Sequence, residues 1–220
     1  PDSRALYFVS NRKGGYGESD IYVSYVEDGW FTKPINLGPV INTSGNEERP
    51  QIHTDNQTLY FSSEGHVGMG GFDLYVSRKQ GEDEWSKTEN LGYPINTPGY
   101  ENAIFVDNEG KLALLASERE GGFGQSDIYS FEVPEAAKPL TVTYIKGIVI
   151  DDETNKPLEA NVQIIDLETG KNYVSTISDP ELGFLLTIPA GKDYAYNVNR
   201  DGYLFYSQNF AYAESEPTEP

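Results

Sequence analysis

The sequence YFSSEGHVGMGGFDLY, residues 60–75, recurs in two further versions along this chain. These are YFVSNRKGGYGESDIY, residues 7–22, and LLASEREGGFGQSDIY, residues 114–129, which align without gaps at offsets of 53 and 54 residues. Five columns are identical in all three versions: Ser10/Ser63/Ser117, Gly15/Gly68/Gly122, Gly17/Gly70/Gly124, Asp20/Asp73/Asp127 and Tyr22/Tyr75/Tyr129. A period of this length indicates a fold assembled from equivalent supersecondary units.

A second block recurs between these stretches. Residues 36–47 (NLGPVINTSGNE) and 90–101 (NLGYPINTPGYE) agree at eight of 12 positions, and a tryptophan precedes each block. Within one period, short strands are predicted at residues 50–53, 58–63, 73–78 and 85–91, joined by turns rich in Asn, Asp and Gly. Four short antiparallel strands in a period of about 50 residues are typical of a β-propeller blade.

The composition favours an all-β chain and argues against several functions. Aromatic residues make up 13% of the 220 residues, and 22 Gly and 13 Pro can supply turns. The net charge of -19 is unfavourable for contact with nucleic-acid phosphates. The chain has no Cys, which excludes disulfides and thiol chemistry. No stretch approaches the roughly 20 apolar residues of a membrane-spanning helix.

The repeats resemble the blades of TolB-type, tryptophan-aspartate-repeat-like propellers. The likeness is carried by Leu59–Ser63 (LYFSS) and Asp73–Tyr75 (DLY), and it covers roughly residues 4–133. The segment Asn90–Gly99 (NLGYPINTPG) is similar to a blade connection in the propellers of Bacteroidetes OmpA-family envelope proteins. The resemblance implies a propeller fold and a place in the cell envelope.

The predicted propeller, residues 1–133, is incomplete. One blade is complete (about 50–91), one lacks its first strand (4–37) and one lacks its last (103–133), which makes about two and a half four-stranded blades. Because propellers need at least four blades, either the missing blades lie upstream or another copy completes the ring. Since residue 1 is Pro, we expect the chain to begin within a longer protein or after processing.

A second domain is predicted after a polar, Pro-bounded linker at residues 134–142. Strands are expected at 143–150, 160–166, 172–178, 183–188, 194–199 and 206–212, which fits a small β-sandwich. Residues 143–212 resemble a carboxypeptidase-regulatory-like (transthyretin-like) domain through Gly147, Val149, Asp151, Thr154, Pro157, Leu158, Ala160 and Val162. In OmpA-family envelope proteins the resemblance implies a peptidoglycan-binding neighbour, and the acidic tail 213–220 is expected to be a linker toward it.

Candidate catalytic or metal-binding groups are few. His53 and His66 have no paired motif spacing, so we expect strand or turn positions rather than a base or a zinc site. The Gly-rich segments 14–17, 68–71 and 121–124, which contain the repeated Gly15, Gly68 and Gly122, are expected to be tight turns that need Gly for positive φ rather than sites that hold phosphate.

The repeated aspartates Asp20, Asp73 and Asp127 are expected to accept backbone N–H bonds from the preceding glycine turn. A ring of carboxylates that binds Ca²⁺ or sugar hydroxyls is the alternative.

Binding candidates lie at the rim of the predicted propeller. They are cationic and aromatic residues that flank the turns, where a partner or glycan can be contacted: Arg12, Lys13, Tyr16, Arg119 and Phe123.

The resemblance therefore implies a non-enzymatic scaffold or protein-interaction module in the periplasm, associated with the outer membrane, in a type IX secretion assembly. Its partners are expected to be other cell-envelope proteins, with peptidoglycan reached only through a neighbouring domain, and no cofactor, catalytic residue or metal ligand is assigned. The alternative is a carbohydrate-binding or carbohydrate-cleaving module that uses the propeller's central channel.

Overall fold

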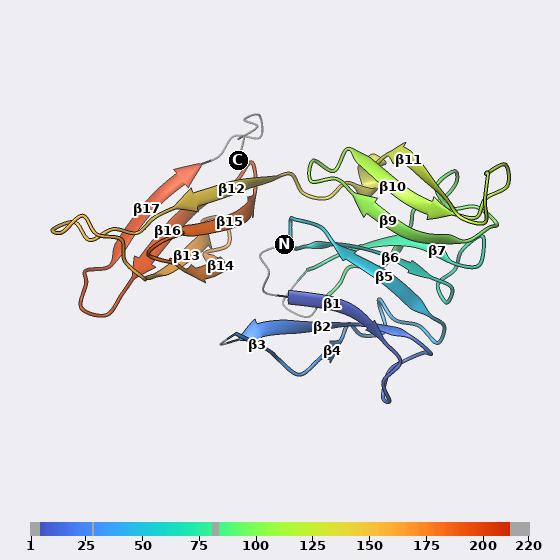
Figure 1. The fold of residues 1–220 in the computed structure, drawn as a ribbon, viewed down its shortest axis with the longest axis horizontal. Coiled ribbons are helices and arrows are strands. Elements are labelled where there is room, and N and C mark those ends of the chain that lie inside the picture. The colour runs from blue at the N-terminus through green and yellow to red at the C-terminus, as the bar shows by residue number, and fades with distance from the viewer. Residues whose placement is uncertain (1–4, 28, 81–83, 212–220) are drawn as a thin grey trace. The chain divides into compact units, whose positions relative to one another are not determined.

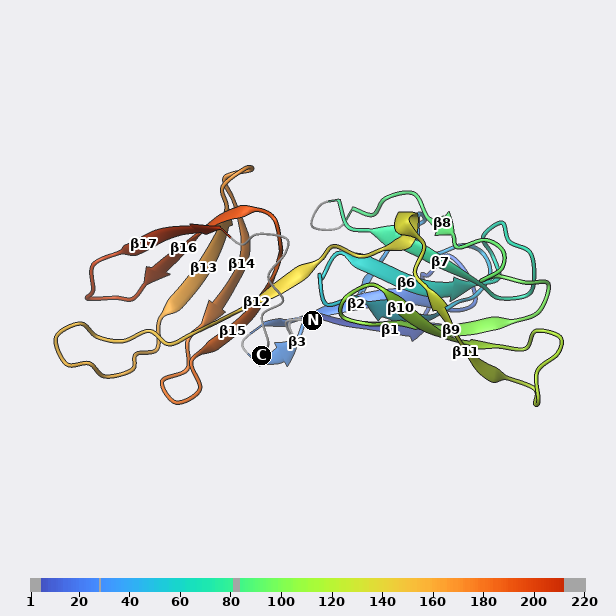
Figure 2. The ribbon, with the colours of Figure 1, turned by 90° about the horizontal axis from the view of Figure 1, so that it is seen from above.

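The computed structural model describes residues 5–27, 29–80 and 84–211, and its paired strands run antiparallel (Figures 1 and 2). In this part of the chain the strands are accompanied by one 3₁₀ turn, η1 (Glu135–Ala137). The chain divides into two compact units, Pro1–Leu140 and Thr141–Pro220. The predicted all-β class is therefore confirmed. The tail predicted at 213–220 lies outside the described residues.

Each sequence repeat forms one antiparallel sheet of the first unit. The first sheet contains β1 (Ala5–Ser10), β2 (Asp20–Glu27), β3 (Trp30–Phe31) and β4 (Ile35–Asn36). The second contains β5 (Glu47–Ile52), β6 (Thr58–Ser63), β7 (Asp73–Arg78) and β8 (Glu89–Asn90), in that order. The third contains β9 (Glu101–Val106), β10 (Leu112–Ser117) and β11 (Asp127–Glu132).

The three sheets share one register across their central strand pair. In each sheet the repeated serine lies opposite the repeated aspartate, at the end of the strands where the hairpin turn begins: Ser10↔Asp20, Ser63↔Asp73 and Ser117↔Asp127. The sequence repeat is therefore a structural repeat.

Two strands of the second sheet differ from the prediction. β5 begins at Glu47 rather than residue 50, because Glu47 and Glu48 already lie opposite Ser63 and Ser62 of β6. The strand expected at 85–91 is reduced to the two residues of β8. Trp85 instead makes an isolated bridge with Lys79 and is buried in the core beneath the sheet.

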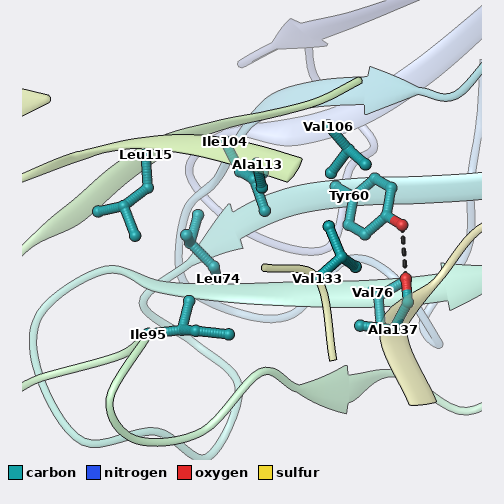
Figure 3. Close-up of a cluster of buried hydrophobic side chains, with 10 residues drawn as sticks. All are labelled: Tyr60, Leu74, Val76, Ile95, Ile104, Val106, Ala113, Leu115, Val133 and Ala137. Carbon is teal, nitrogen blue, oxygen red and sulfur yellow. Dashed lines mark hydrogen bonds between the residues drawn. The ribbon is translucent and has the colours of Figure 1, made fainter. Parts of the chain in front are cut away.

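The core of the first unit lies in two layers between the three sheets. One cluster joins the first and second sheets: Ile21, Val23, Leu37, Ile41, Leu59, Phe61, Tyr75 and Trp85. The other joins the second and third: Tyr60, Leu74, Val76, Ile95, Ile104, Val106, Ala113, Leu115, Val133 and Ala137 (Figure 3). All six residues of β6 are buried, because successive side chains point to opposite faces and both faces are covered.

The second unit contains two antiparallel sheets around a core of its own. β12 (Val142–Gly147) pairs with β15 (Phe184–Pro189). The second sheet has the order β14 (Lys171–Ile177), β13 (Asn161–Asp166), β16 (Asp193–Asn199) and β17 (Tyr206–Ala211). Both sheets contribute to the buried cluster of Ile145, Ile164, Leu186, Ile188 and Tyr194. Each of the six strands lies within three residues of its predicted bounds.

The segment expected to be a linker is attached to the first unit. Ala137 is buried in the core, and its carbonyl accepts a hydrogen bond from the Tyr60 hydroxyl at 2.5 Å (Figure 3). Arg78 donates to the carbonyls of Ala136 and Lys138 at 2.6 and 3.0 Å. Residues 134–140 therefore close the end of the first unit, and β12 begins at Val142.

Candidate functional site

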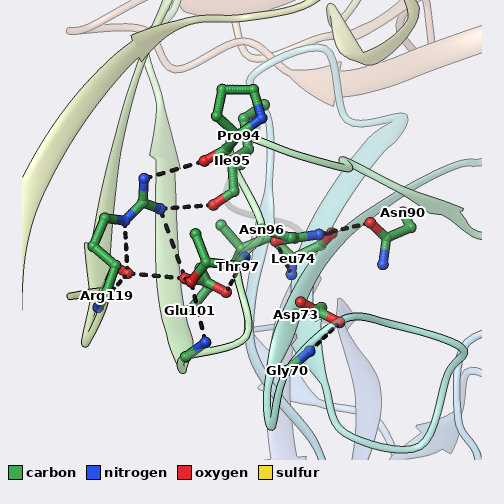
Figure 4. Close-up of polar contacts among 12 residues, drawn as sticks. Gly70, Asp73, Leu74, Asn90, Pro94, Ile95, Asn96, Thr97, Glu101 and Arg119 are labelled. Atoms are coloured by element: carbon green, nitrogen blue, oxygen red, sulfur yellow. Dashed lines mark hydrogen bonds and ion pairs between the residues drawn. The ribbon is translucent and has the colours of Figure 1, made fainter.

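The recurring residues gather at one end of the three sheets. This turn end is built from the hairpin turns 11–19, 64–72 and 118–126, together with the connections 36–47 and 90–101 that run from one repeat to the next. Figure 4 shows the part of it where the second repeat meets the third. Because the turn end holds the residues that sequence analysis selected, it is the candidate functional site.

The repeated aspartates fix the hairpin turns. Asp20 accepts hydrogen bonds from the amides of Tyr16 and Gly17 at 2.7 and 3.0 Å. In the second repeat Asp73 accepts from the amides of Met69 and Gly70. In the third, Asp127 accepts from those of Phe123 and Gly124 at 2.8 and 3.2 Å. The carboxylates therefore point into their own turns and do not converge on a common ligand.

The repeated glycines Gly15, Gly68 and Gly122 are required for space, and the positive φ predicted for the Gly-rich turns lies at a neighbouring glycine in two of the three. A Cβ atom on Gly15, Gly68 or Gly122 would lie 1.9, 1.6 or 2.2 Å from the carboxylate oxygen of the aspartate that the turn binds. Positive φ is found instead at the neighbouring Gly14 and Gly121. The carboxylate can therefore approach the turn only where no side chain is present.

Each connection begins by pairing with the sheet that it leaves. Asn42 accepts from the Ile21 amide at 2.8 Å and donates to the Ile21 carbonyl at 2.9 Å. Asn96 makes the same two bonds with Leu74, at 2.8 and 2.9 Å (Figure 4). Both amide side chains act as an extra strand residue: they accept from the Ile21 and Leu74 amides, and they add a second donor to carbonyls that already accept from the amides of Leu37 and Leu91.

Each connection ends at a glutamate that is buried against the next sheet. Glu101 is 0% exposed and accepts from the Thr97 amide at 3.0 Å, the Thr97 hydroxyl at 2.7 Å and the Ser117 hydroxyl at 2.9 Å (Figure 4). Glu47, also 0% exposed, accepts the equivalent bonds from Thr43 and Ser63. Buried carboxylates are stable only when they are bonded in this way. These two residues join one repeat to the next.

Arg119 adds further contacts between the third repeat and the connection that precedes it. Its guanidinium donates to the carbonyls of Pro94 and Ile95 at 3.1 and 2.7 Å and lies 3.7 Å from a Glu101 oxygen (Figure 4). Its Cζ atom is 4.7 Å from the centre of the Tyr129 ring. This rim candidate is thus engaged within the chain.

In the second repeat, where Gly65 aligns with Arg119, the next residue, His66, contacts the incoming connection instead. Its Nε2 atom donates to the Ile41 carbonyl at 2.8 Å, and its ring is 5.2 Å from that of Tyr75. Burial raises the pKa of the Tyr75 hydroxyl, so this ring stays neutral. The other histidine, His53, is buried and bonds to the Asp107 carbonyl at 2.8 Å, away from the turn end. His53 Nδ1 lies 3.8 Å from an Asp55 carboxylate oxygen, but its Nε2 atom is engaged with the Asp107 carbonyl and is not free to take a proton from a nucleophile.

The side chains at the tips of the turns are exposed and apolar. Tyr16, Met69 and Phe123 occupy the same position in the three repeats and are 52%, 48% and 106% exposed. Arg12 and Lys13 are also exposed, and the Arg12 guanidinium lies over the rings of Phe8 and Tyr22. The polar groups of the turn end are mostly bonded internally, whereas its apolar tips face solvent.

Sequence analysis missed four residues that organise this end of the sheets: Asn42, Asn96, Glu47 and Glu101. The signal was present, because the repeated block begins with Asn-Leu-Gly and closes on Glu. An acidic residue that recurs at the close of a repeated connection is a candidate for a buried joint. Considered outside the repeat, the same residue would be interpreted as part of the charged surface.

Within residues 5–27, 29–80 and 84–211, no three His, Asp or Glu side chains are grouped so as to hold a metal ion. None of the described helical segments has the length and apolar character needed to cross a membrane.

Comparison with known proteins adds little. No protein-family model matches the chain, and no curated protein sequence matches it. Among solved structures it is similar to one described as "Biofilm associated protein - BSP domain", with 12% sequence identity and a TM-score of 0.20. The match covers 78% of this chain and 30% of that structure.

Proposed function

We propose that this chain is a non-enzymatic protein-interaction module of an OmpA-family cell-envelope protein. Its first unit is an arc of two and a half β-propeller blades and its second is a transthyretin-like β-sandwich. The module works as a periplasmic scaffold close to the outer membrane, within a type IX secretion assembly. Family resemblance supports the location, and the chemistry of the turn end supports the mode of action.

The proposal rests on a contrast at the turn end between polar side chains that are bonded within the chain and apolar side chains that are exposed. The charged and amide side chains that recur there are bonded within the chain, as Glu101 and Asn96 illustrate. Tyr16, Met69 and Phe123 leave apolar surface exposed at one repeated position. Aromatic and Met side chains are enriched at protein interfaces, where they bury large apolar area. The turn tips are therefore the surface on which we expect a protein partner to bind.

The placement of the repeated aspartates favours this function over glycoside cleavage. The carboxylates of Asp20, Asp73 and Asp127 each accept hydrogen bonds from backbone amides of their own turn. A glycosidase requires two carboxyl groups that face one another across the scissile bond. A carbohydrate-binding function remains the competing proposal, because Tyr16 and Phe123 offer exposed rings on which a sugar can stack.

The test compares the native envelope complex of the unmodified protein with that of a variant carrying Tyr16→Ser, Met69→Ser and Phe123→Ser. Cells of the native host express each version, and the mass of the complex is measured after mild extraction. We expect the triple variant to run as a smaller species while its unfolding midpoint is unchanged. Leu182→Ser, at a residue that is 80% exposed outside the turn end, is the matched control.

Two results would contradict the proposal. One is a complex of unchanged mass in the triple variant. The other is saturable binding of the purified protein to envelope polysaccharides that the triple variant loses, which would favour the carbohydrate-binding alternative.

A further inference from the structure

The loop between β16 and β17 exposes apolar side chains that the core of the second unit does not include. It comprises residues 200–205, and together with the first residue of β17 it contains the sequence Tyr-Leu-Phe-Tyr at 203–206, here called the YLFY segment (Figure 1). Leu204 is 95% exposed and Phe205 is 63% exposed. The flanking Tyr203 and Tyr206 are 47% and 52% exposed. None of these four residues belongs to the buried cluster of the second unit.

The base of this loop is fixed by hydrogen bonds. The Tyr203 amide donates to the Arg200 carbonyl at 3.1 Å, and Gly202 between them has a φ of 85°, as in a type II turn. The Tyr203 hydroxyl donates to Asp151 Oδ2 at 2.7 Å, and Arg200 Nη1 donates to the Glu159 carbonyl at 3.0 Å. Because three hydrogen bonds hold the turn, the apolar side chains that follow it protrude from a fixed base.

The size of the YLFY segment favours a lipid surface over a protein partner. A specific protein interface buries about 800 Å² on each side. Four side chains that are each about half exposed or more supply roughly half of that area, since an aromatic side chain buries about 150–250 Å² when it is covered completely. A bilayer needs no complementary surface. Leu and Phe side chains enter its acyl boundary, and Tyr side chains are enriched at the level of the headgroups.

Negative charge lies beside the YLFY segment and decides which lipids suit it. Asp201 is in the loop itself, and Tyr203 bonds to Asp151, the first residue of the acidic run 151–153 (Asp-Asp-Glu). The loop contributes one cation, Arg200. The bond from Tyr203 is the largest of the effects that lower the pKa of the Asp151 carboxyl, so this group is ionised at neutral pH. Carboxylates repel anionic headgroups, which attract cationic segments instead. The matching surface is therefore zwitterionic.

We propose that the YLFY segment inserts into the interface of a bilayer with zwitterionic headgroups. Leu204 and Phe205 enter the acyl boundary, while the hydroxyls of Tyr203 and Tyr206 stay among the headgroups. The site lies in the second unit and takes lipid, whereas the turn tips lie in the first unit and take protein. The inference therefore goes beyond the proposed function, and it does not depend on it.

The first experiment uses the absence of Cys from the 220-residue chain. Leu204→Cys provides a single thiol for an environment-sensitive fluorescent label, and vesicles of phosphatidylcholine are added to the labelled protein. We expect the emission to shift to the blue and to be quenched by a nitroxide on the lipid acyl chains. The same label at Leu167→Cys, in the turn at the opposite end of β13, should show neither effect.

The second experiment measures partition into sucrose-loaded phosphatidylcholine vesicles by sedimentation. Leu204→Ser combined with Phe205→Ser should lower the partition coefficient about tenfold or more, because the inserted apolar area is lost. The matched control combines Leu167→Ser with Phe123→Ser, at residues that are 42% and 106% exposed, and should bind like the unmodified protein. Since Phe123 is one of the turn tips, this control also shows whether lipid binding is separate from them. Adding phosphatidylglycerol to the vesicles should weaken binding at low salt.

Several outcomes would overturn the proposal. These are no partition at millimolar phosphatidylcholine, equal losses for the two double variants, equal blue shifts at positions 204 and 167, or binding that appears only when phosphatidylglycerol is present. A blue shift at position 204 on raising the protein concentration without vesicles would show that a second copy covers the segment instead.

Discussion

Gly70 and Gly124 occupy the same position of two repeats, and their replacement by Ala should have opposite effects. A Cβ atom on Gly70 would lie 2.2 Å from the Gly99 carbonyl oxygen and 2.5 Å from that of Thr97. A Cβ atom on Gly124 would have its nearest neighbour at 4.0 Å, an oxygen of Asp127. The difference arises because a connection packs on the second turn and none packs on the third in the described residues.

The magnitude follows from these contacts. In Gly70→Ala both clashing atoms belong to the backbone, so the connection must shift, and overpacking of this kind costs about 1–3 kcal/mol. The shift also strains the bond from the Gly71 amide to the Gly99 carbonyl, now 3.1 Å, which adds about 1 kcal/mol. Gly124 has no positive φ, so Gly124→Ala should be neutral or should stabilise by about 0.5 kcal/mol, because it restricts the unfolded chain.

The assay is urea unfolding followed by tryptophan fluorescence. Both tryptophans, Trp30 and Trp85, lie in the first unit, so the signal reports that unit without interference from the second. Gly17→Ala should behave like Gly70→Ala, since its Cβ atom would lie 2.1 Å from the Gly45 carbonyl oxygen. Equal destabilisation by Gly70→Ala and Gly124→Ala would refute the reasoning, because it would mean that the glycines serve the turn and not the connection.

Three further predictions concern buried or titrating groups. Glu101→Ala should destabilise the first unit by about 3 kcal/mol because it leaves buried donors unpaired, whereas Glu109→Gln on the surface should have no measurable effect in the same urea assay. Tyr60→Phe should cost about 1 kcal/mol, since it removes the bond to the Ala137 carbonyl, and a cost near zero would mean that residues 134–140 are not held by it. Partial burial favours the neutral acid at Asp166, but the Lys192 ammonium and two backbone amides outweigh it and lower the pKa of the carboxyl. The resulting stability is present above the unfolded pKa of about 4 and is lost as the pH falls through the lower folded value. Asp166→Asn should therefore flatten the acid limb of thermal unfolding, and an unchanged limb would exclude this residue as its source.

The repeat made most of the strand pattern predictable from the sequence. The alignment of residues 60–75 with its two partners placed the paired strands β6 and β7, and short strand-like runs bounded by turn residues placed the six strands of the second unit. The fourth strand of the repeat was predicted too long, since only Glu89 and Asn90 of residues 85–91 pair with β7. Trp85 is drawn into the core beneath the sheet, and only β8 remains paired.

The sequence predicted where the candidate site lies, but it predicted the contacts that form the site only in part. Asp20 and its equivalents were correctly selected as recurring residues. Gly15 is needed because a Cβ atom there would lie too close to the Asp20 carboxylate, and no spacing in the sequence reveals this distance. Arg119 was selected as a rim residue that could bind a partner. The sequence cannot show that its guanidinium instead reaches the Ile95 carbonyl of the same chain. The buried state of Glu101 likewise depends on a long-range contact with Ser117.

Site-specific photo-crosslinking in the native host tests most directly the claim that the turn tips bind a protein. A photoreactive residue is placed in turn at positions 16, 69 and 123 and, as a control, at position 182. The account predicts that the same protein adduct forms from the three tips and that none forms from position 182. Adducts of equal yield from all four positions, or from position 182 alone, would contradict it.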